Sequence, residues 1–128
     1  MLFTEFGSKE NPPMLLLHGM MQDWHTEYEM LKGLEEHYRL IIPAQDGFYD
    51  GGGDFTSFAD QARQIEEYVQ ANHGGKVIGA YGCSQGGLML TELLTRNKID
   101  FGTVIMDGCY VAHQGKIAGR VTYKMFCK

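Results

Sequence analysis

The sequence predicts an α/β protein with a mostly parallel sheet and helices on both faces. Short continuous apolar runs, typical of strands buried on both sides, occur at residues 14–17, 40–42, 76–81 and 101–106. Segments with the apolar spacing of amphipathic helices lie between these runs. Because strands and helices alternate along the chain, we expect parallel strands joined by right-handed helical crossovers.

Length and composition indicate one globular domain with a substantial core. The chain has 128 residues, of which 44% are hydrophobic and 21% charged. The formal net charge of −5 argues against nucleic acid as a partner. No run is long and apolar enough to span a bilayer, and the amino terminus lacks the features of a signal peptide. Three cysteines at no metal-ligand spacing indicate free thiols in the cytoplasm, and no motif requires a metal or cofactor.

The first half of the chain contains three predicted strands and one helix. Residues 1–7 are expected to form a short edge strand, and the apolar run 14–17 a buried strand. Thr26 and a glutamate three residues later form a capping box, which predicts a helix starting there. Its apolar positions are Tyr28, Leu31 and Leu34. The next strand, 40–42, is expected to stop at Pro43.

The second half continues the alternation. A long loop over 44–56 leads to a helix capped by Ser57 and ended by the glycines at 74–75. The buried stripe of this helix is expected to contain Phe58, Ala62, Ile65 and Val69. Two further strands follow, at 76–81 and 101–106, with a helix over 87–94 between them.

The most informative motif is Gly-Cys-Ser-Gln-Gly at residues 82–86. A serine between two glycines at a strand-to-helix turn matches the nucleophile elbow, which holds the serine hydroxyl clear of the backbone. The pattern alone is weak, but here a strand is predicted before it and a helix after it. The predicted nucleophile is Ser84, and Cys83 is interpreted as a small apolar filler.

A serine nucleophile needs a base, a group that orients the base, and hydrogen-bond donors for the oxyanion. One donor is expected from the backbone N–H of Gln85, at the start of the helix. The second is expected from the loop after the first buried strand, His18-Gly19-Met20. No feature of the sequence alone identifies the base.

These motifs together resemble the α/β-hydrolase family over roughly residues 12 to 108. Leu-Leu-Leu-His-Gly at 15–19, Pro43 with the glycine-containing loop after it, and the elbow occur in that family's order and spacing. The resemblance implies that Ser84 is the nucleophile and that the backbone N–H groups of Met20 and Gln85 form the oxyanion hole. It also implies a serine hydrolase, esterase-like, that cleaves a small ester, thioester or amide through an acyl-Ser84 intermediate.

The sequence departs from the family in length. Members are commonly about twice as long and usually carry their acid and histidine after later strands. The chain therefore resembles an amino-terminal half, with a truncated hydrolase fold. Some members place the acid after the strand that ends at Asp107, so Asp107 is a candidate acid, although a residue that simply ends a strand explains it equally well. The alternative function is a non-catalytic half that folds and associates without turnover.

None of the histidines matches the family's catalytic position. The resemblance gives His18 a structural role near the oxyanion loop. His37 and His73 fall at helix ends, where polar groups are common. His25 and His113 lie in segments that could approach the active edge, but an ordinary loop histidine is the favoured interpretation of each.

Two regions remain without a family role. Asp46, Asp50 and Asp54 flank a glycine-rich loop without the calcium-loop pattern, so a solvated loop is expected. Residues 109–128 carry four basic residues and no acidic ones, which predicts either the start of a cap or a basic amphipathic helix. The basic residues are Lys116, Arg120, Lys124 and Lys128. The whole chain is expected to be one domain, 1–128, which self-associates through the unpaired edge of the 101–106 strand or through this tail.

Overall fold

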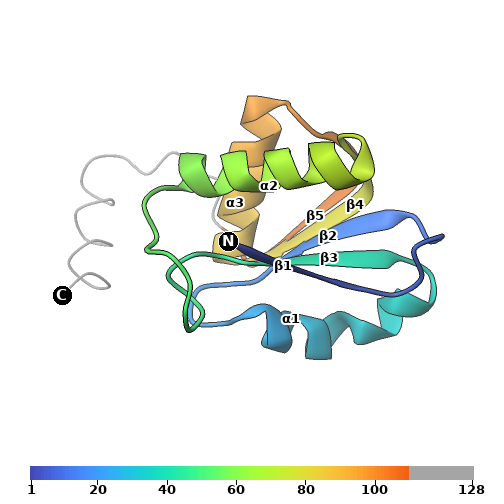
Figure 1. Cartoon of the computed structure of the whole chain (residues 1–128), viewed down its shortest axis with the longest axis horizontal. Helices are drawn as coiled ribbons and strands as arrows, with labels where there is room; N and C mark the ends of the chain where they lie inside the picture. Colours follow the sequence, from blue (N-terminus) through green and yellow to red (C-terminus); the bar gives the residue numbers. More distant parts are fainter. Residues whose placement is uncertain (110–128) are drawn as a thin grey trace.

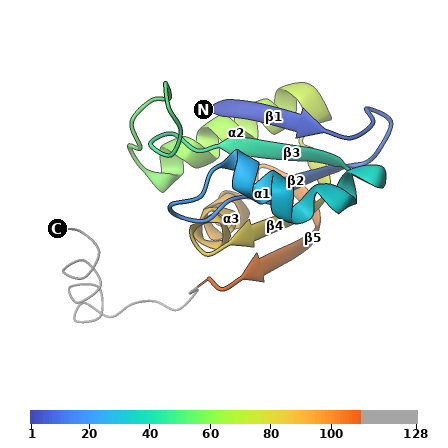
Figure 2. The same ribbon diagram turned by 90° about the horizontal axis from the view of Figure 1, so that it is seen from below.

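The computed structural model describes residues 1–109 and contains one five-stranded sheet. Its strands, in the order β1-β3-β2-β4-β5 across the sheet, lie with β1 and β5 at the two edges (Figure 2). Their bounds are β1 Leu2–Phe6, β2 Pro13–Leu17, β3 Arg39–Ala44, β4 Lys76–Cys83 and β5 Asp100–Asp107. Strand β1 pairs antiparallel with β3, and all other neighbours are parallel. The predicted mostly parallel α/β fold is confirmed.

Helices cover both faces of the sheet, as predicted. Helices α2 (Phe58–His73) and α3 (Gln85–Arg96) lie on one face, and α1 (Trp24–Leu31) with the short 3-10 helix η1 (Lys32–Glu36) lies on the other (Figure 1). The larger apolar core lies under α2 and α3 and includes Ile65, Val69 and Leu90. The smaller core lies under α1 and is built around Leu16, Leu40 and Ile42.

Two predicted boundaries are wrong. Helix α1 is capped by Asp23, whose carboxylate accepts hydrogen bonds from the Thr26 N–H at 3.0 Å and the Thr26 hydroxyl at 3.1 Å. The Glu29 carboxylate binds Lys32 and does not complete a capping box. Strand β3 continues through Pro43 to Ala44, because its register with β2 ends at Ile41 and the strand tolerates a residue without an N–H beyond that point.

The expected solvated loop over 44–56 is also partly wrong. Asp46 is buried, and its backbone N–H donates to Gln61 Oε1 at 3.0 Å. Its carboxylate accepts from Gln61 Nε2 at 3.1 Å and from Gln64 Nε2 at 2.9 Å. Burial raises the pKa of Asp46, but the Met1 ammonium at 2.9 Å, followed by these two amides, outweighs burial and holds the pKa below its usual range. Asp46 therefore ties the loop to α2.

The predictions for residues 110–128, including a cap or a basic tail helix, concern residues outside the described range. Within residues 1–109, no helix is long and apolar enough to cross a membrane.

Candidate active site

Ser84 occupies the turn between β4 and α3, at the carboxyl edge of the sheet. Its backbone has φ 47° and ψ −108°, a conformation rarely adopted by residues other than glycine. The Ser84 N–H donates to the Asp107 carbonyl oxygen at 2.8 Å, which ties the turn to the end of β5. A non-glycine residue held at positive φ by its surroundings is the geometry expected at a nucleophile elbow.

The turn is closely packed and accepts only glycine at two flanking positions. A Cβ at Gly82 would lie 2.5 Å from the Gly86 carbonyl oxygen, and a Cβ at Gly86 would overlap the Leu17 carbonyl oxygen. A Cβ at Gly87 would meet Cys109 at 2.5 Å. The missing side chains therefore allow α3 to start directly against the end of β2.

The end of β2 and the elbow lie in contact. A Cβ built at Gly19 would be 3.5 Å from the Cys83 carbonyl oxygen, and one at Gly86 would be 3.0 Å from the His18 carbonyl oxygen. Gln85 is the first residue of α3, where a backbone N–H has no intrahelical acceptor. Met20 follows Gly19 directly, so both predicted oxyanion donors belong to the segments that meet here.

The loop after β2 is held in shape by a side chain. The Gly19 N–H donates to Gln22 Oε1 at 3.0 Å, and the Gln22 N–H donates back to the Gly19 carbonyl oxygen at 3.3 Å. Met21 has φ 64°, so this turn contains a second non-glycine residue at positive φ. The loop that carries Met20 is thus a defined turn.

His18 is buried and has partners at both ring nitrogens. The Gln45 N–H donates to Nε2 at 3.2 Å, so Nε2 accepts and Nδ1 carries the proton that is donated to the Gly19 carbonyl oxygen at 3.0 Å. Burial lowers the pKa of His18, which keeps the ring neutral. This histidine links β2 to the end of β3 and is not available as a base.

The other described histidines lie away from the Ser84 hydroxyl or are exposed. His73 Nε2 donates to the Glu5 carboxylate of β1 at 2.7 Å, and His37 is exposed at the end of η1. The ring of His25 is largely exposed, stacks on Trp24 and contacts the Asp23 carboxylate at 3.1 Å. Within residues 1–109, no hydrogen bond joins the Ser84 hydroxyl to a histidine. His113 lies outside the described residues.

Asp107 lies at the end of β5, paired in register with Cys83. The Tyr81 hydroxyl donates to its carboxylate at 2.8 Å. Burial, followed by this hydrogen bond, raises the pKa of Tyr81 well above its usual range. Burial also raises the pKa of the Cys83 thiol, with a smaller contribution from Glu27 and Asp107, so the thiol stays protonated. The Asp107 carboxylate is exposed, and it lies at the same carboxyl edge of the sheet as Ser84.

The sequence interpretation missed Glu27. This residue of α1 is completely buried, and burial raises the pKa of its carboxyl to about 7. A signal was present, because Trp24, Glu27, Leu31 and Leu34 follow the i, i+3, i+7, i+10 spacing of one helix face. The sequence analysis placed the apolar face of this helix at Tyr28, Leu31 and Leu34, and so it did not consider Glu27 as a buried position.

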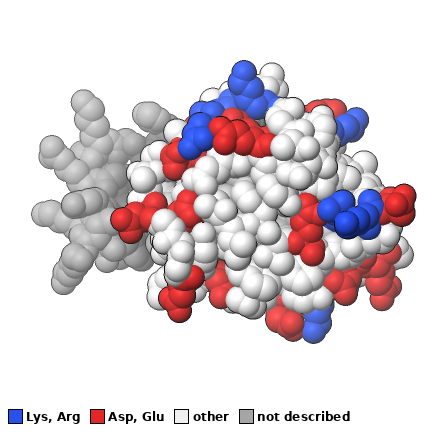
Figure 3. Space-filling view, in the orientation of Figure 1, with Lys and Arg blue, Asp and Glu red and all other residues white. Residues whose placement is uncertain are grey.

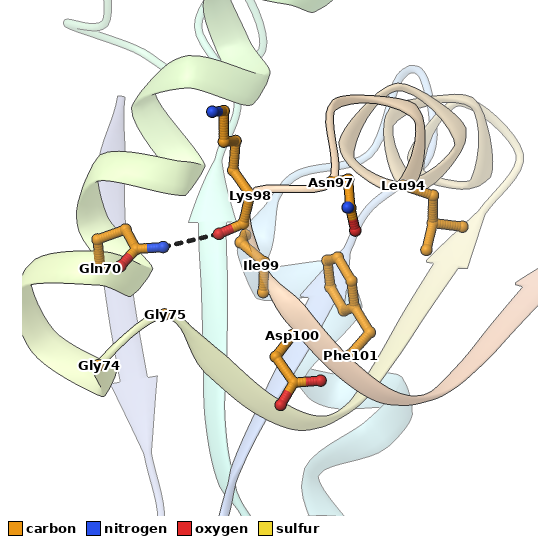
Figure 4. Close-up of a pocket in the computed structure, with 9 residues that line it drawn as sticks. All are labelled: Gln70, Gly74, Gly75, Leu94, Asn97, Lys98, Ile99, Asp100 and Phe101. Atoms are coloured by element: carbon orange, nitrogen blue, oxygen red, sulfur yellow. Dashed lines mark hydrogen bonds between the residues drawn. The ribbon is translucent and has the colours of Figure 1, made fainter.

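A hollow elsewhere in the described residues carries no nucleophilic side chain. A hollow of about 430 Å³ lies at the opposite end of the sheet, between the end of α2 and the start of β5, where Gln70 reaches across to the Lys98 carbonyl oxygen (Figure 4). Its lining contains no cysteine, serine or histidine side chain. Within residues 1–109, no group of three or more His, Cys, Asp or Glu side chains could hold a metal ion. Within the described residues, the elbow is therefore the site with the better chemical support.

The face shown in Figure 3 has charges around its rim and an uncharged centre, and its basic side chains lie beside acidic ones. Among the ion pairs of α2, Arg63 contacts Asp60 at 2.7 Å and Glu67 at 2.8 Å. This face therefore has no broad basic patch.

Comparisons with known proteins agree with the geometry. Residues 12–110 match the sequence profile of the alpha/beta hydrolase fold family. No curated protein matches the chain. Among solved structures, an alpha/beta hydrolase family protein from Desulfitobacterium hafniense is similar with a TM-score of 0.84 and 24% identity, over 97% of this chain and 50% of that one.

Two further solved structures have a similar fold and also match this chain over about half of their own length. A thermophilic esterase from Thermogutta terrifontis has a TM-score of 0.80 and 18% identity, over 96% of this chain and 45% of that one. The epoxide hydrolase CorEH has a TM-score of 0.75 and 21% identity, over 97% and 46% respectively. This chain thus spans about half the length of these proteins. The profile match covers most of the sequence, and the chain belongs to the alpha/beta hydrolase fold family.

Proposed function

We propose that the protein is a serine hydrolase that cleaves an ester, thioester or amide through an acyl-Ser84 intermediate. The observation that carries this proposal is the backbone of Ser84, held at φ 47° between a strand and a helix with glycines at the positions where a Cβ would collide. A strained serine in such a turn has its hydroxyl exposed for attack. A similar esterase structure supports ester chemistry.

In the proposed reaction, Ser84 Oγ attacks the carbonyl carbon while its proton passes to a base. The carbonyl π electrons move to the oxygen, and the backbone N–H groups of Met20 and Gln85 stabilise the resulting oxyanion. Collapse of this intermediate breaks the bond to the leaving group, which takes the proton from the base. Water then attacks the acyl-enzyme in the same way and releases the acid.

The base and the acid that orients it complete this proposal. Because His18 is engaged at both ring nitrogens, we do not assign the base to it. Asp107 remains the candidate acid, since its carboxylate lies at the carboxyl edge of the sheet and is fixed by Tyr81.

A non-catalytic function is the second candidate. It is favoured by one observation, that no described histidine is hydrogen-bonded to the Ser84 hydroxyl within residues 1–109. Removing the base from a catalytic triad lowers the rate by several orders of magnitude. In that case the protein would fold and associate without turnover.

A fluorophosphonate probe separates the two candidates. We expect rapid labelling of Ser84, located by peptide mass spectrometry, and its loss in Ser84→Ala. As a matched control, Ser57→Ala removes the cap of α2, remote in sequence from the elbow, and should leave labelling unchanged. No labelling of the wild-type protein would favour the non-catalytic function.

The proposed function includes a substrate class, a cofactor requirement, a partner class and a cellular location. We propose a small acyl substrate, no cofactor, no nucleic-acid partner, and a location in the reducing cytoplasm. The thiols of Cys83 and Cys109 are free, which is compatible with a reducing compartment.

A further inference from the structure

A tyrosine on β4 is hydrogen-bonded to the candidate acid. The Tyr81 hydroxyl donates to Oδ2 of the Asp107 carboxylate at 2.8 Å. In the register of the two parallel strands, Asp107 lies opposite Cys83, two residues beyond Tyr81, so the bond runs diagonally between β4 and β5. Side chains two residues apart on a strand point to the same face, and Tyr81 packs on the α1 face. The pair therefore lies on the α1 face, at the edge of the sheet that carries Ser84.

The backbone of Asp107 is held at the elbow as well. Its carbonyl oxygen accepts a hydrogen bond from the Ser84 N–H at 2.8 Å, so the candidate acid and the nucleophile lie at the ends of adjacent strands. Neighbouring strands are about 5 Å apart. A single imidazole that is hydrogen-bonded at both ends can bridge a serine hydroxyl and a carboxylate placed in this way. The Asp107 side chain is exposed, so a base can reach it.

An exposed carboxylate is free to rotate, and the bond from Tyr81 restricts this rotation. The tyrosine ring is itself held, because it packs against the apolar core around Leu16 and Leu40. Burial, followed by the hydrogen bond to Asp107, raises the pKa of Tyr81, so the hydroxyl keeps its proton at neutral pH and remains a donor. With one carboxylate oxygen bound to Tyr81, the other is left to accept from a second donor.

We propose that Tyr81 is a positioning residue, whose hydroxyl holds the Asp107 carboxylate in the orientation that accepts a hydrogen bond from the base of Ser84. The proposal rests on the proposed serine hydrolase function, with Asp107 as its acid. In a catalytic triad the acid fixes the orientation of the imidazole and stabilises its charged form. Loss of this alignment lowers the rate of the chemical step and leaves substrate binding unchanged.

The test measures kcat and KM of the whole chain for p-nitrophenyl butanoate. Tyr81→Phe keeps the ring in the core and removes the donor. We expect kcat to fall by about 10-fold or more, with KM within about twofold of wild type. Tyr38→Phe is the matched control, because Tyr38 lines the same apolar hollow on the α1 face and, within residues 1–109, its hydroxyl makes no hydrogen bond. It should leave both constants unchanged.

A double-mutant cycle with Asp107→Ala separates positioning from a structural effect of the tyrosine. Asp107→Ala alone should lower kcat by about 1000-fold or more. Adding Tyr81→Phe should lower it no further, because no carboxylate is then left to align. The rate at which a fluorophosphonate labels Ser84 gives the same cycle for variants whose turnover is too slow to follow.

An unchanged kcat in Tyr81→Phe would overturn the proposal, as would an equal loss with and without the Asp107 side chain. If Asp107→Ala keeps the wild-type kcat, the proposal is overturned and the hydrolase function stands. If Tyr81→Phe fails to fold, as judged by thermal melting, Asp107→Ala decides alone: a large loss of kcat supports the proposal and an unchanged kcat overturns it. Absent labelling of Ser84 in wild type would refute the hydrolase function and this proposal together.

Discussion

Gly86 connects the nucleophile turn to the neighbouring strand, because its α-carbon lies where any side chain would collide with the Leu17 carbonyl oxygen. We expect Gly86→Ala to lower the free energy of unfolding by about 3 kcal/mol, since the overlap is with backbone that cannot rotate away. Urea denaturation followed by circular dichroism measures this. Gly33→Ala is the control, because nothing lies within 4 Å of a Cβ there, and it should change stability by less than about 1 kcal/mol. Equal stabilities for the two variants would contradict the packing at the elbow.

Glu27 makes stability depend on pH. Its carboxyl has an ordinary pKa of 4.5 when unfolded and about 7 when folded, so the folded state holds the proton more tightly. The stability that this provides is present in full below about pH 4.5 and is lost as the pH rises to about 7. At about 1.4 kcal/mol per pKa unit, the loss is about 3 kcal/mol.

Urea unfolding of wild type and Glu27→Gln at pH 5 and pH 8 checks this dependence. The variant cannot ionise at this position, so its stability relative to wild type should increase from pH 5 to pH 8. Glu29→Gln provides the baseline for an exposed glutamate on the same helix. A constant difference between wild type and Glu27→Gln would show that the Glu27 pKa is ordinary.

Ser84 and Glu27 differ in how far the sequence could predict their positions in the structure. Ser84 was found at its turn because the elbow is a local pattern, set by small residues next to one another in the chain. Glu27 was missed because the apolar stripe of its helix was drawn through Tyr28, although the spacing of Trp24, Glu27 and Leu31 also fits one helix face.

At the scale of the elements, α2 and α3 are joined by a partly buried ion pair. The Arg96 guanidinium binds the Glu66 carboxylate with two hydrogen bonds, at 2.7 and 2.9 Å, and Glu66 is largely buried. We expect Arg96→Ala to lower stability by about 2 kcal/mol, because it leaves the Glu66 charge without its partner. Chemical denaturation measures the change.

Arg63→Ala is the matched control for this pair. Arg63 also contacts two carboxylates, but it lies exposed on α2 and its partners are on the same helix. Its loss should change stability by about 0.5 kcal/mol or less. A similar effect of the two substitutions would show that the link between α2 and α3 contributes no more than a surface pair.

Element types were predicted more reliably than their ends. The apolar runs identified four of the five strands, β2 to β5, and the remaining strand, β1, was expected as an edge strand at residues 1–7. The start of α1 was misplaced because Thr26 with Glu29 and Asp23 with Thr26 are both valid capping patterns, and only the observed hydrogen bonds choose between them. Pro43 was misinterpreted because proline stops a strand only where its N–H is needed for pairing.

At the scale of the molecule, the alternation of strands and helices predicted the parallel sheet but not the order of its strands. That order places β2 between β3 and β4, and it brings Gly19 to the elbow. The burial of Asp46 is a consequence of the same long-range packing, because its partners are on α2. Such contacts have no local signal in the sequence.

The β5 edge carries the last prediction. Within the described residues, β5 pairs only with β4, and the sheet beside it has an apolar hollow of about 450 Å³ on the α1 face. Ile78 and Ile105 are 45% and 50% exposed there. A strand whose outer edge has no partner strand, next to an exposed apolar surface, favours association. We therefore expect a second copy of this chain to cover this edge.

Light scattering coupled to size-exclusion chromatography measures this association. Ile105→Lys should shift the protein to a monomer, because a charge on the apolar side of the edge strand opposes pairing. Met30→Lys is the control, since Met30 is 56% exposed on α1 and lies outside the hollow, so the assembly should persist. A wild-type protein that stays monomeric at high concentration would mean that the β5 edge is not an interface between copies. Association that survives Ile105→Lys would place the interface elsewhere.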